Sequence, residues 1–418
     1  MSIGYACLTI GVNNTNYKSC IMKNASKERL LEIISHNLNS LENIIDYNIK
    51  NKIMLFRISS DLIPFGSSPV NDINWWDVFS SKFKSIGKKI KESNMRVSMH
   101  PGQYTVLNSP NEDIVAKAIE DLNYHNKVLD SLDLEEDHKI VLHIGGVYNN
   151  KKEAIKRFIQ NYDKLYDNIK KRLVIENDDK SYNICDVLAI SKVLDIPVIY
   201  DNLHNNINPS FEKKSDFYWI EQCNKTWKSK DGHQKIHYSQ QKPFKKAGSH
   251  SNTIKINEFI DFYNNLNNKS IDIMLEVKDK NLSAVKCINC TESDKNIKKL
   301  ELEWAKYKYN VLEHSSQNYL EIRKILKQKT DYPVLEFYNL IEDSFIIEVS
   351  VGNTINAAQH IWGYFKNCTT EKEKNDFFKK IDNYENERIS IANIKKYLFK
   401  LAIKYDQKYL LNSYYFIL

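Results

Sequence analysis

The chain contains few cysteines and no long apolar run, and both absences limit what kind of protein it can be. Its 418 residues include 7 Cys, an odd number at irregular spacing, which favours a reduced cytoplasm over a secreted, disulfide-bonded protein. Because no run of about 20 apolar residues occurs, the sequence predicts neither a membrane-spanning helix nor a signal peptide. Glycine and proline are also scarce, at 11 and 8 residues, which an AT-rich genome would explain without a structural cause.

Charge and length set looser limits. The formal net charge is +7, which is compatible with a polyanionic partner because Lys and Arg that neutralise phosphates release counterions. This charge is weak evidence by itself. With 418 residues, of which 42% are hydrophobic, the chain can bury a sizeable core and is long enough for more than one domain.

Short apolar runs recur along the first 280 or so residues, and each stops at a polar or metal-binding residue. Stretches long enough for a helix separate them, such as Ser26–Asn48 and Glu153–Lys171. Continuous Val, Ile and Leu runs between helical segments are typical of buried parallel strands. Eight such units in succession predict an α/β fold, a (β/α)8 TIM-type barrel, in which loops at the carboxyl ends of the strands converge on one cavity. The runs are Ile3–Cys7, Ile53–Asp61, Met95–His100, Ile140–His143, Leu173–Glu176, Pro197–Asp201, Lys235–His237 and Ile271–Glu276.

Potential metal ligands stand at the ends of these strands or in the loops that follow. A lone His or carboxylate there is usually a satisfied polar group, but a whole set converging on one cavity indicates a metal site. The set is His100, His143, Glu176, Asp201, His204, His237, His250 and Glu276. The remaining histidines occur in helical or loop segments without carboxylate neighbours, and we expect them to lie outside the site; they are His36, His125, His138, His233, His314 and His360.

The types of ligand indicate the metal and the chemistry. Imidazoles and carboxylates without Cys suit Zn²⁺, Mn²⁺ or Fe²⁺ better than a structural zinc site. This many ligands exceed the needs of one ion, so we expect two or three ions about 3.5 to 4 Å apart, a spacing that stabilises the attacking and leaving oxygens of a phosphodiester. The pattern therefore predicts metal-assisted phosphoryl hydrolysis. A sugar isomerase on the same barrel is the nearest alternative, and it would act on free aldoses and ignore DNA.

Six motifs in register resemble the UV damage endonuclease family over residues 1–285. They are Phe56–Asp61, Met99–Tyr104, His143–Gly146, Ile175–Lys180, Lys235–Ser239 and Ser249–His250. The resemblance implies a metal-dependent barrel, similar in fold to endonuclease IV, that nicks DNA immediately 5′ of UV photoproducts (cyclobutane dimers, 6-4 photoproducts) and some other lesions. The implied partner is damaged double-stranded DNA, and the implied cofactors are two or three divalent ions, with manganese favoured and zinc, magnesium or cobalt as alternatives.

The resemblance also assigns roles to individual residues. It makes Glu176 the bridging, catalytic carboxylate. It matches Lys235 to a second catalytic residue near the metals, where carboxylation would turn the amine into a carbamate ligand; a strand-end Lys that reaches solvent is the alternative. The ligands divide into three groups: His100 with His143, Asp201 with His237 and Glu276, and His204 with His250.

Gln103 and Tyr104 directly follow the His100 ligand, so they would project over the metal cavity. In the family, the matching pair enters the duplex at the lesion, where a flat ring replaces lost stacking and an amide addresses orphaned base edges. Tyr5 matches another lesion-contacting position. Ordinary packing is the alternative for both tyrosines in a chain with 25 Tyr.

Two positions depart from the family pattern. Ser68 stands before Pro69 where relatives usually carry a His, and Leu8 and Thr9 stand where the family often has Asn. Weaker occupancy of one metal or a shifted lesion range would follow. Two other functions therefore stay open, an abasic-site nuclease closer to endonuclease IV and a lesion-binding module whose cutting has weakened.

The pattern changes after residue 285. We expect a polar linker over residues 286–299, in which Cys287 and Cys290 form a solvent-exposed CxxC without a partner pair. Apolar residues then recur at helical spacing, which predicts a smaller, mostly α-helical domain over residues 300–418, with Phe345–Val349 as a candidate strand.

The helical segment carries a second resemblance. Motifs at 304–308, 311–315, 353–354, 360–365 and 409–411 resemble the YbgA-like helical domain of unknown function. We expect this domain to add grip on DNA or to recruit a partner. The whole chain is expected to be a cytoplasmic monomer that associates with the nucleoid when acting.

Overall fold

The computed structural model describes residues 1–329 and 331–418. These residues form two compact units. The first contains Met1–Ile254 and Asp261–Ile288, and the second contains Lys255–Ile260 and Asn289–Leu418. Each unit is described below by itself.

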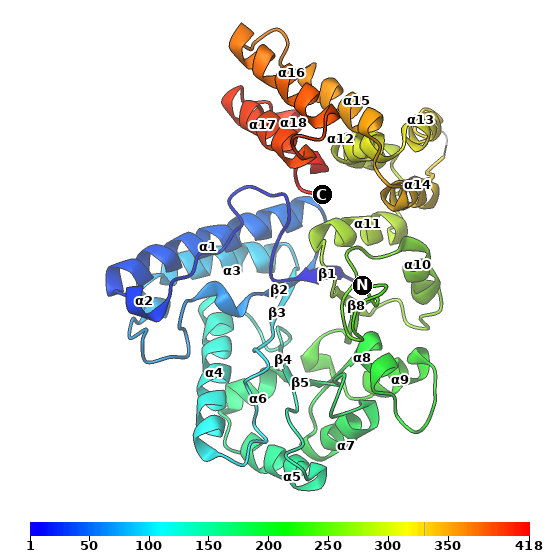
Figure 1. The fold of residues 1–418 in the computed structure, drawn as a ribbon. Helices are drawn as coiled ribbons and strands as arrows, with labels where there is room; N and C mark the ends of the chain where they lie inside the picture. Colours follow the sequence, from blue (N-terminus) through cyan, green and yellow to red (C-terminus); the bar gives the residue numbers. More distant parts are fainter. Residues whose placement is uncertain (330) are drawn as a thin grey trace. The chain divides into compact units, whose positions relative to one another are not determined.

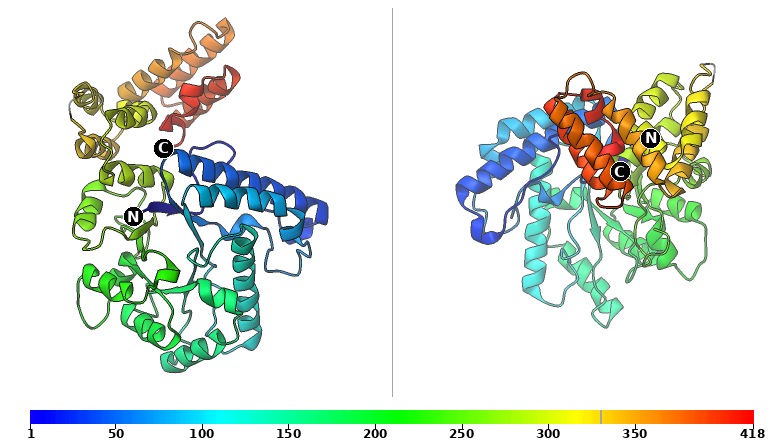
Figure 2. Two further views of the ribbon diagram at one scale, coloured as in Figure 1. Left: turned by 180° about the vertical axis from the view of Figure 1, so that it is seen from behind. Right: turned by 45° about the horizontal axis from the view of Figure 1, so that its top comes forward.

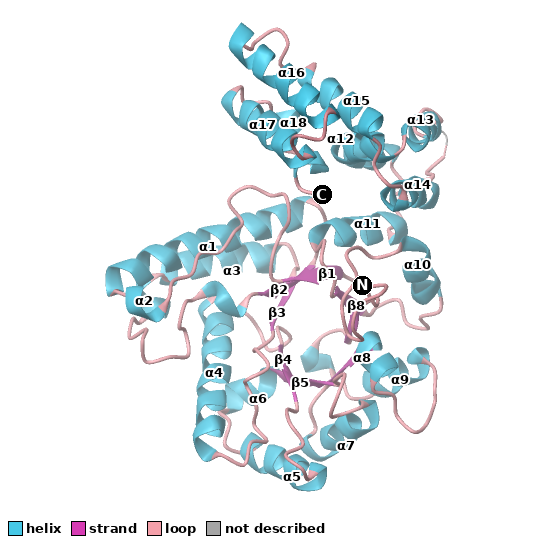
Figure 3. Ribbon diagram, in the orientation of Figure 1, coloured by secondary structure: helices cyan, strands magenta, loops and turns pink. Residues whose placement is uncertain are grey.

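Eight parallel strands form a closed barrel in the order β1-β2-β3-β4-β5-β6-β7-β8, as the ring of magenta strands in Figure 3 shows. The barrel closes where β1 pairs with β8, with Ile3 opposite Ile273. The (β/α)8 barrel predicted from the sequence is confirmed. The strands are β1 (Ile3–Ala6), β2 (Leu55–Ile58), β3 (Arg96–Met99), β4 (Ile140–His143), β5 (Leu173–Glu176), β6 (Val198–Asp201), β7 (Lys235–Tyr238) and β8 (Asp272–Leu275).

Helices surround the strands on the outside of the barrel (Figure 1). The expected helix at Ser26–Asn48 is α1, which begins after the N-cap Ser26 and buries one apolar face. The expected helix at Glu153–Lys171 is two helices. The helices of this unit, some of which extend into the second, are α1 (Lys27–Lys50), α2 (Trp75–Val78), α3 (Ser80–Glu92), α4 (Glu112–Ser131), α5 (Lys151–Tyr162), α6 (Asp167–Arg172), α7 (Ile184–Leu194), α8 (Asn202–Ile207), α9 (Asp216–Asn224), α10 (Ile256–Asn264) and α11 (Asn281–Thr291).

Neighbouring helices of the outer layer are joined by ion pairs. Helices α1 and α3 run side by side in both views of Figure 2, and Lys89 of α3 lies 2.8 Å from Asp46 and 3.1 Å from Glu42 of α1. These pairs are partly exposed, so we expect each to contribute at most about 1 kcal/mol. The apolar faces beneath them supply most of the cohesion.

An apolar layer inside the barrel supports the carboxyl ends of three strands. Val141, Val174 and Ile199 pack together in one cluster. Because side chains two residues apart on a strand share a face, the polar residues that end these strands lie on the same face as this layer. Those residues are His143, Glu176 and Asp201.

The second unit is helical over its described residues. A core of its own includes Trp362, whose ring stacks on Phe377 at 4.5 Å between centroids. The candidate strand at Phe345–Val349 is wrong, because α14 continues to Ile346. The helices are α12 (Ile297–His314), α13 (Ser316–Ile325), α14 (Val334–Ile346), α15 (Val351–Trp362), α16 (Glu371–Glu385), α17 (Ile391–Lys404) and α18 (Lys408–Leu411).

The stretch expected to be a polar linker contains helical residues. It includes the end of α11 and the start of α12, and Cys287 is fully buried, so the exposed position predicted for that cysteine is wrong. In the described part of the chain, no helix has the length and apolar character needed to cross a membrane.

Candidate metal centre

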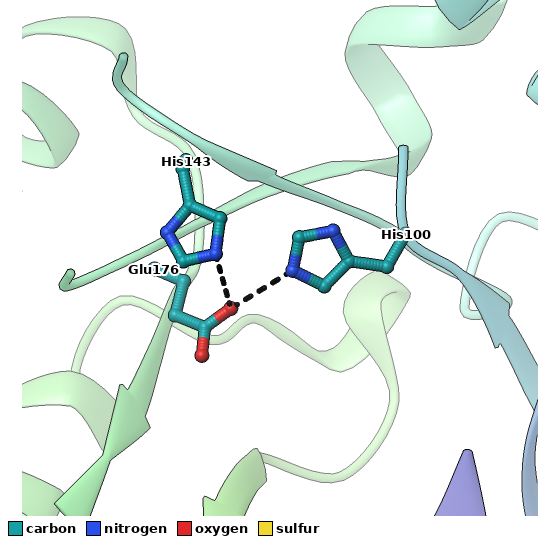
Figure 4. A group of neighbouring side chains, drawn as sticks. All are labelled: His100, His143 and Glu176. Carbon is teal, nitrogen blue, oxygen red and sulfur yellow. Dashed lines mark hydrogen bonds and ion pairs between the residues drawn. The ribbon is translucent and has the colours of Figure 1, made fainter. Parts of the chain in front are cut away.

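Glu176 forms the centre of a cluster of imidazoles. It is the last residue of β5, and its side chain is 1% exposed. Its Oε2 lies 3.3 Å from Nε2 of His100 and 3.7 Å from Nε2 of His143, which Figure 4 shows converging on one oxygen. Its Oε1 lies 2.7 Å from Nδ1 of His237. One carboxylate is therefore shared by imidazoles from three segments of the barrel.

Backbone carbonyls orient two of the imidazoles. Nδ1 of His100 donates to the carbonyl of Pro101 at 3.0 Å, which leaves Nε2 unprotonated in the neutral ring and facing Glu176. Nδ1 of His204 donates to the carbonyl of Asn177 at 2.9 Å. A metal-bound His usually donates its other ring N–H to such an acceptor. The geometry therefore leaves Nε2 of both rings available as a ligand.

Asp201 presents a buried carboxylate oxygen without a hydrogen-bond partner among the described residues. The residue ends β6 and caps α8, where its Oδ1 accepts from the backbone N–H of His204 at 2.8 Å, while Oδ2 has no partner. Burial raises the pKa of Asp201 to about 7. A buried polar atom without a partner is costly, so Oδ2 is suited to a cation.

The ligand atoms form two close groups. The first group is His100, His143 and Glu176, and the second is Glu176, Asp201 and His237; within each, the potential ligand atoms lie within 4.8 Å of one another. Nδ1 of His143 is also buried and has no hydrogen-bond partner in the part of the chain that the structure describes. These nitrogen and oxygen donors fit borderline or hard divalent ions that share Glu176.

Arg57 joins the cluster from β2 and was not predicted from the sequence. Its Nη2 lies 2.6 Å from Oε1 of Glu276 and donates to Nε2 of His237 at 2.9 Å. Although burial favours a neutral carboxyl, Arg57 and His237 hold the pKa of Glu276 well below its usual range. The sequence signal was a charged residue inside the buried strand Leu55–Ile58, because such a cation needs a buried partner.

The other predicted ligands lie around this cluster. His204 is 3.7 Å from Glu176, and His250 is 3.7 Å from Glu276. Burial alone would lower the pKa of His204, but Asp201, Glu176 and Glu276 raise it to about 9. All eight predicted residues therefore converge at the same end of the barrel. Which ion each would bind stays a prediction.

Amide side chains hold the strand ends that carry these ligands. Asn177 donates to the carbonyl of Asp201 at 3.0 Å and accepts from its N–H at 2.9 Å. Asn202 makes the same reciprocal pair with Ser239, at 3.0 and 2.8 Å. Each side-chain amide pairs with the backbone N–H and carbonyl of a residue at the end of the neighbouring strand, as a backbone group would in a sheet. The ends of β5, β6 and β7 are therefore fixed relative to one another.

Lys235 lies inside the barrel at the start of β7. It is 2% exposed, so the alternative in which this lysine reaches solvent is wrong. Burial, assisted by Arg96 and Arg57, lowers the pKa of Lys235 well below its usual value. Because Lys235 and His237 are two residues apart on one strand, their side chains share a face. The neutral amine is favoured near the metal ligands.

Gln103 and Tyr104 lie in an exposed turn directly after the His100 ligand. Tyr104 is 84% exposed. Thr105 anchors the turn by donating to Oδ2 of Asp121 in α4 at 2.5 Å. The turn borders a groove of about 760 Å³, whose other walls include Lys117 of α4 and the loop after β4. The predicted lesion-probing pair is therefore presented at the barrel mouth.

Tyr5 points away from the barrel mouth. Its hydroxyl donates to Asn48 of α1 at 2.8 Å and lies 2.7 Å from Oγ1 of Thr9, and the residue is fully buried. Its ring therefore packs between β1 and the helix layer in this conformation. The lesion contact predicted for Tyr5 stays a prediction. Ser68 uses its hydroxyl locally, as the acceptor for the N–H of Val70.

His125 lies behind the His100 loop. Its Nδ1 donates to the carbonyl of Asp121 at 2.6 Å, and its Nε2 lies 2.8 Å from the hydroxyl of Ser60. The expectation that His125 and His138 lack carboxylate neighbours is wrong, since Asp121 lies 3.8 Å and Asp137 lies 3.7 Å away, respectively. Among the described residues, neither ring contacts a side chain of the Glu176 cluster directly, although the Ser60 hydroxyl beside His125 also donates to the backbone carbonyl of His100 at 3.0 Å.

Comparison with known proteins identifies both parts of the chain. Residues 1–333 match the family described as UV-endonuclease UvdE, and residues 308–418 match a protein of unknown function, DUF1722. A UV DNA damage endonuclease of Clostridium perfringens (strain 13 / Type A) is 42% identical over 97% of both chains. A UV DNA damage endonuclease of Bacillus cereus (strain B4264) is 33% identical over 69% of this chain and 92% of its own.

A solved structure agrees with this assignment. The crystal structure of SacUVDE is 43% identical and superposes with a TM-score of 0.66, covering 69% of this chain and 97% of its own. The family assignment agrees with the barrel fold and with the cluster around Glu176. The chain belongs to the UV-endonuclease UvdE family and carries a C-terminal domain of unknown function.

Proposed function

We propose that this chain is a metal-dependent DNA repair endonuclease that nicks the backbone immediately 5′ of UV photoproducts. The observation that carries the proposal is the shared Glu176 carboxylate at the barrel mouth, beside an exposed Gln103–Tyr104 turn. Imidazole and carboxylate ligands suit Mn²⁺, Zn²⁺ and related ions, and we infer two or three ions, with manganese favoured. The relatives named UV DNA damage endonuclease support this substrate class.

Residues of the chain would hold the ions in a defined arrangement. His100, His143, Asp201 and His237 surround Glu176, and His204, His250 and Glu276 complete the set. When bound, divalent ions at such a site supply a hydroxide at neutral pH and neutralise charge on the scissile phosphodiester. The carboxylate of Glu176 would fix the ions relative to each other. Arg57 would hold Glu276 ionised and in place.

DNA would bind with the lesion at the groove beside α4. Tyr104 and Gln103 would enter the stack where the damaged bases leave it, because a lesion that already distorts the helix lowers the cost of extrusion. The product would carry 3′-hydroxyl and 5′-phosphate ends. The lysine at the start of β7 would act next to the metals, and its low pKa supports carboxylation, since the neutral amine is the form that reacts with carbon dioxide.

Incision of end-labelled duplexes tests this function. Purified protein with Mn²⁺ is expected to cut a duplex with one cyclobutane dimer immediately 5′ of the dimer and to leave undamaged duplex intact. Cutting of an abasic-site duplex alone would instead place the chain with abasic-site nucleases. Lesion binding without any cutting would contradict the endonuclease proposal and favour a lesion-binding module.

A further inference from the structure

Phe244 has no packing role in the fold. It lies in the loop between β7 and α10, and its side chain is 105% exposed, which means that the ring contacts almost nothing. An exposed aromatic ring on a surface loop contributes little to stability. It is therefore free to contact a ligand.

The loop that carries Phe244 is built without using the ring. The side chain of Gln241 lies inside the loop, where Nε2 donates to the carbonyls of Lys242 and Lys246 at 3.0 Å each, and Oε1 accepts from the N–H of Gly248 at 2.9 Å. Gln241 also pairs with His250 at the base of the loop. We name residues 241–250 the Phe244 loop. Its internal bonds hold the ring outward.

The Phe244 loop is basic. It carries three lysines, at positions 242, 245 and 246, and no acidic residue. Lys245 and Lys246 are both exposed. The preceding segment after β6 has a similar composition, with the fully exposed Phe211 followed by Lys213 and Lys214 beside Glu212. Positive charge interleaved with an exposed ring suits a nucleic acid.

The barrel order places this loop across the mouth from the lesion-probing turn. Gln103 and Tyr104 follow β3, whereas the Phe244 loop follows β7, and three strands lie between β3 and β7 in either direction around the closed barrel. Both follow carboxyl strand ends, so they border the same mouth. The loop ends at His250, which lies 3.7 Å from Glu276 of the candidate metal centre.

We propose that the Phe244 loop is a second DNA contact, an inference that rests on the proposed endonuclease function. Lys245 and Lys246 bind phosphates of the duplex flank, and the Phe244 ring stacks on or enters a base step there. Apolar rings inserted between base steps unstack and kink a duplex. Contacts on opposite sides of the mouth would thus bend the DNA over the metal centre, with Tyr104 at the lesion and Phe244 at the flank.

Binding to a fluorescent duplex with one cyclobutane dimer tests the ring. For the full-length protein, Phe244→Ala is expected to weaken binding about tenfold, because each base–aromatic stack contributes this order of affinity. Phe244→Trp should restore it. A 2-aminopurine placed at flanking steps should brighten with the wild type and with Phe244→Trp, but not with Phe244→Ala. Tyr166→Ala, which removes a 60% exposed ring before α6, is the matched control and should bind as wild type.

A salt titration tests the lysines. Lys245→Gln/Lys246→Gln should reduce the slope of log affinity against log salt by about two, because each lost phosphate contact removes about 0.9 from the slope. Lys225→Gln/Lys230→Gln changes the charge equally on the segment between α9 and β7 and should leave the slope unchanged.

The results separate this inference from the proposed function. If wild type cuts the dimer duplex and Phe244→Ala matches it in affinity, incision and 2-aminopurine signal, the loop is not a DNA contact and the endonuclease function stands. If wild type never cuts, but its binding depends on Phe244, the contact stands and the endonuclease function is wrong. The inference would also be overturned if Phe244→Ala changed the binding of another protein but left DNA affinity unchanged.

Discussion

Buried charges at the barrel mouth repel one another, and this repulsion prepares the site for cations. Glu176 and Asp201 are buried and Glu276 is partly buried, and the two glutamates help to raise the pKa of Asp201 after burial itself. Arg57 compensates part of the charge by contacting Glu276 at 2.6 Å. A divalent ion would compensate the negative charge that Arg57 leaves unbalanced.

Glu176→Gln is expected to remove incision with little effect on the fold. The amide keeps the shape of the side chain but lacks the charge that would hold two ions, so turnover should fall by about 10²- to 10³-fold. The measurement is incision of the dimer duplex, with circular dichroism to verify folding. Glu92→Gln, an exposed glutamate at the end of α3, is the control. Wild-type turnover in Glu176→Gln would refute the bridging role.

Metal affinity should rise with pH because both Asp201 and His204 must lose protons to bind an ion. Their pKa values are raised to about 7 and about 9. Below pH 7 binding would release up to about two protons, between about 7 and 9 about one, and above 9 none. Calorimetry with Mn²⁺ in buffers of different ionisation enthalpy measures this release. Asp201→Asn should remove the first step, and a pH-independent affinity would contradict the prediction.

The same pKa shifts affect the stability of the metal-free protein. The contribution of these groups to the free energy of unfolding falls as the pH rises, whereas metal affinity increases. Both pKa values lie above their ordinary values of 3.8 and 6.5, so the folded chain holds more protons than the unfolded chain between about pH 4 and 9. The contribution of these two groups to the free energy of unfolding is therefore greatest at low pH and is lost as the pH rises through this window.

At the scale of elements, close approach of helices depends on single glycines. In α3, a Cβ on Gly87 would lie 1.8 Å from the carbonyl oxygen of Leu132, which follows α4. The backbones are thus too close for any side chain. In α15 of the helical unit, a Cβ on Gly352 would meet nothing within 4 Å.

This contrast predicts opposite effects of one substitution. Gly87→Ala should reduce the free energy of unfolding by about 1 to 3 kcal/mol or more, because the added methyl forces the two segments apart. Gly352→Ala should leave stability unchanged or raise it by up to about 1 kcal/mol, through higher helix propensity. Urea denaturation of both variants provides the comparison. Equal effects would show that the packing between α3 and α4 tolerates the methyl group.

The positions of the strands could be predicted from the sequence. Whether a given strand side chain points into the barrel or toward the surrounding helices could not. Apolar runs and intervening helices are local patterns, so all eight strands were found. Tyr5 and Arg57 are central residues of neighbouring strands, yet the first points to α1 and the second into the ligand cluster. That difference depends on the tilt and register of the closed barrel. A break in the helix expected at Glu153–Lys171 likewise reflects packing, with Tyr166 in an extended conformation before α6.

The candidate ligands were predictable because each follows a strand, and parallel strands of a barrel share one carboxyl edge. The amides that fix them were not. Asn177 and Asn202 make reciprocal bonds only with neighbouring strands in space, and an isolated Asn gives no sign of this. His125 was expected to lie outside the site, and its contact with Ser60 likewise depends on the fold.

At the scale of the whole molecule, two relatives align with only part of this chain. The Bacillus cereus relative and SacUVDE align over 92% and 97% of their own lengths, but over only 69% of this chain. The helical domain has its own core around Trp362 and Phe377. Its sequence matches a domain of unknown function, DUF1722, over residues 308–418.

Truncation after Thr291, at the end of α11, tests the role of the helical domain. We expect the truncated protein to keep kcat for incision within about twofold, because all candidate ligands precede this point, and to bind DNA more weakly if the domain adds grip. Incision kinetics and duplex affinity, compared with the full chain, measure both quantities. Unchanged affinity, lesion choice and turnover would exclude the grip hypothesis and leave recruitment of a partner.

Pairing of β1 with β8 affects when the barrel can form during synthesis. Ile3 pairs with Ile273, so the ring cannot close until nearly all of the barrel has left the ribosome. About 140 residues of this sequence follow β8, and at about 5 to 20 residues per second their translation lasts roughly 7 to 28 s. The nascent barrel can therefore close while the chain is still attached to the ribosome, so β1 and β8 can pair with each other before they meet the strand edges of other chains.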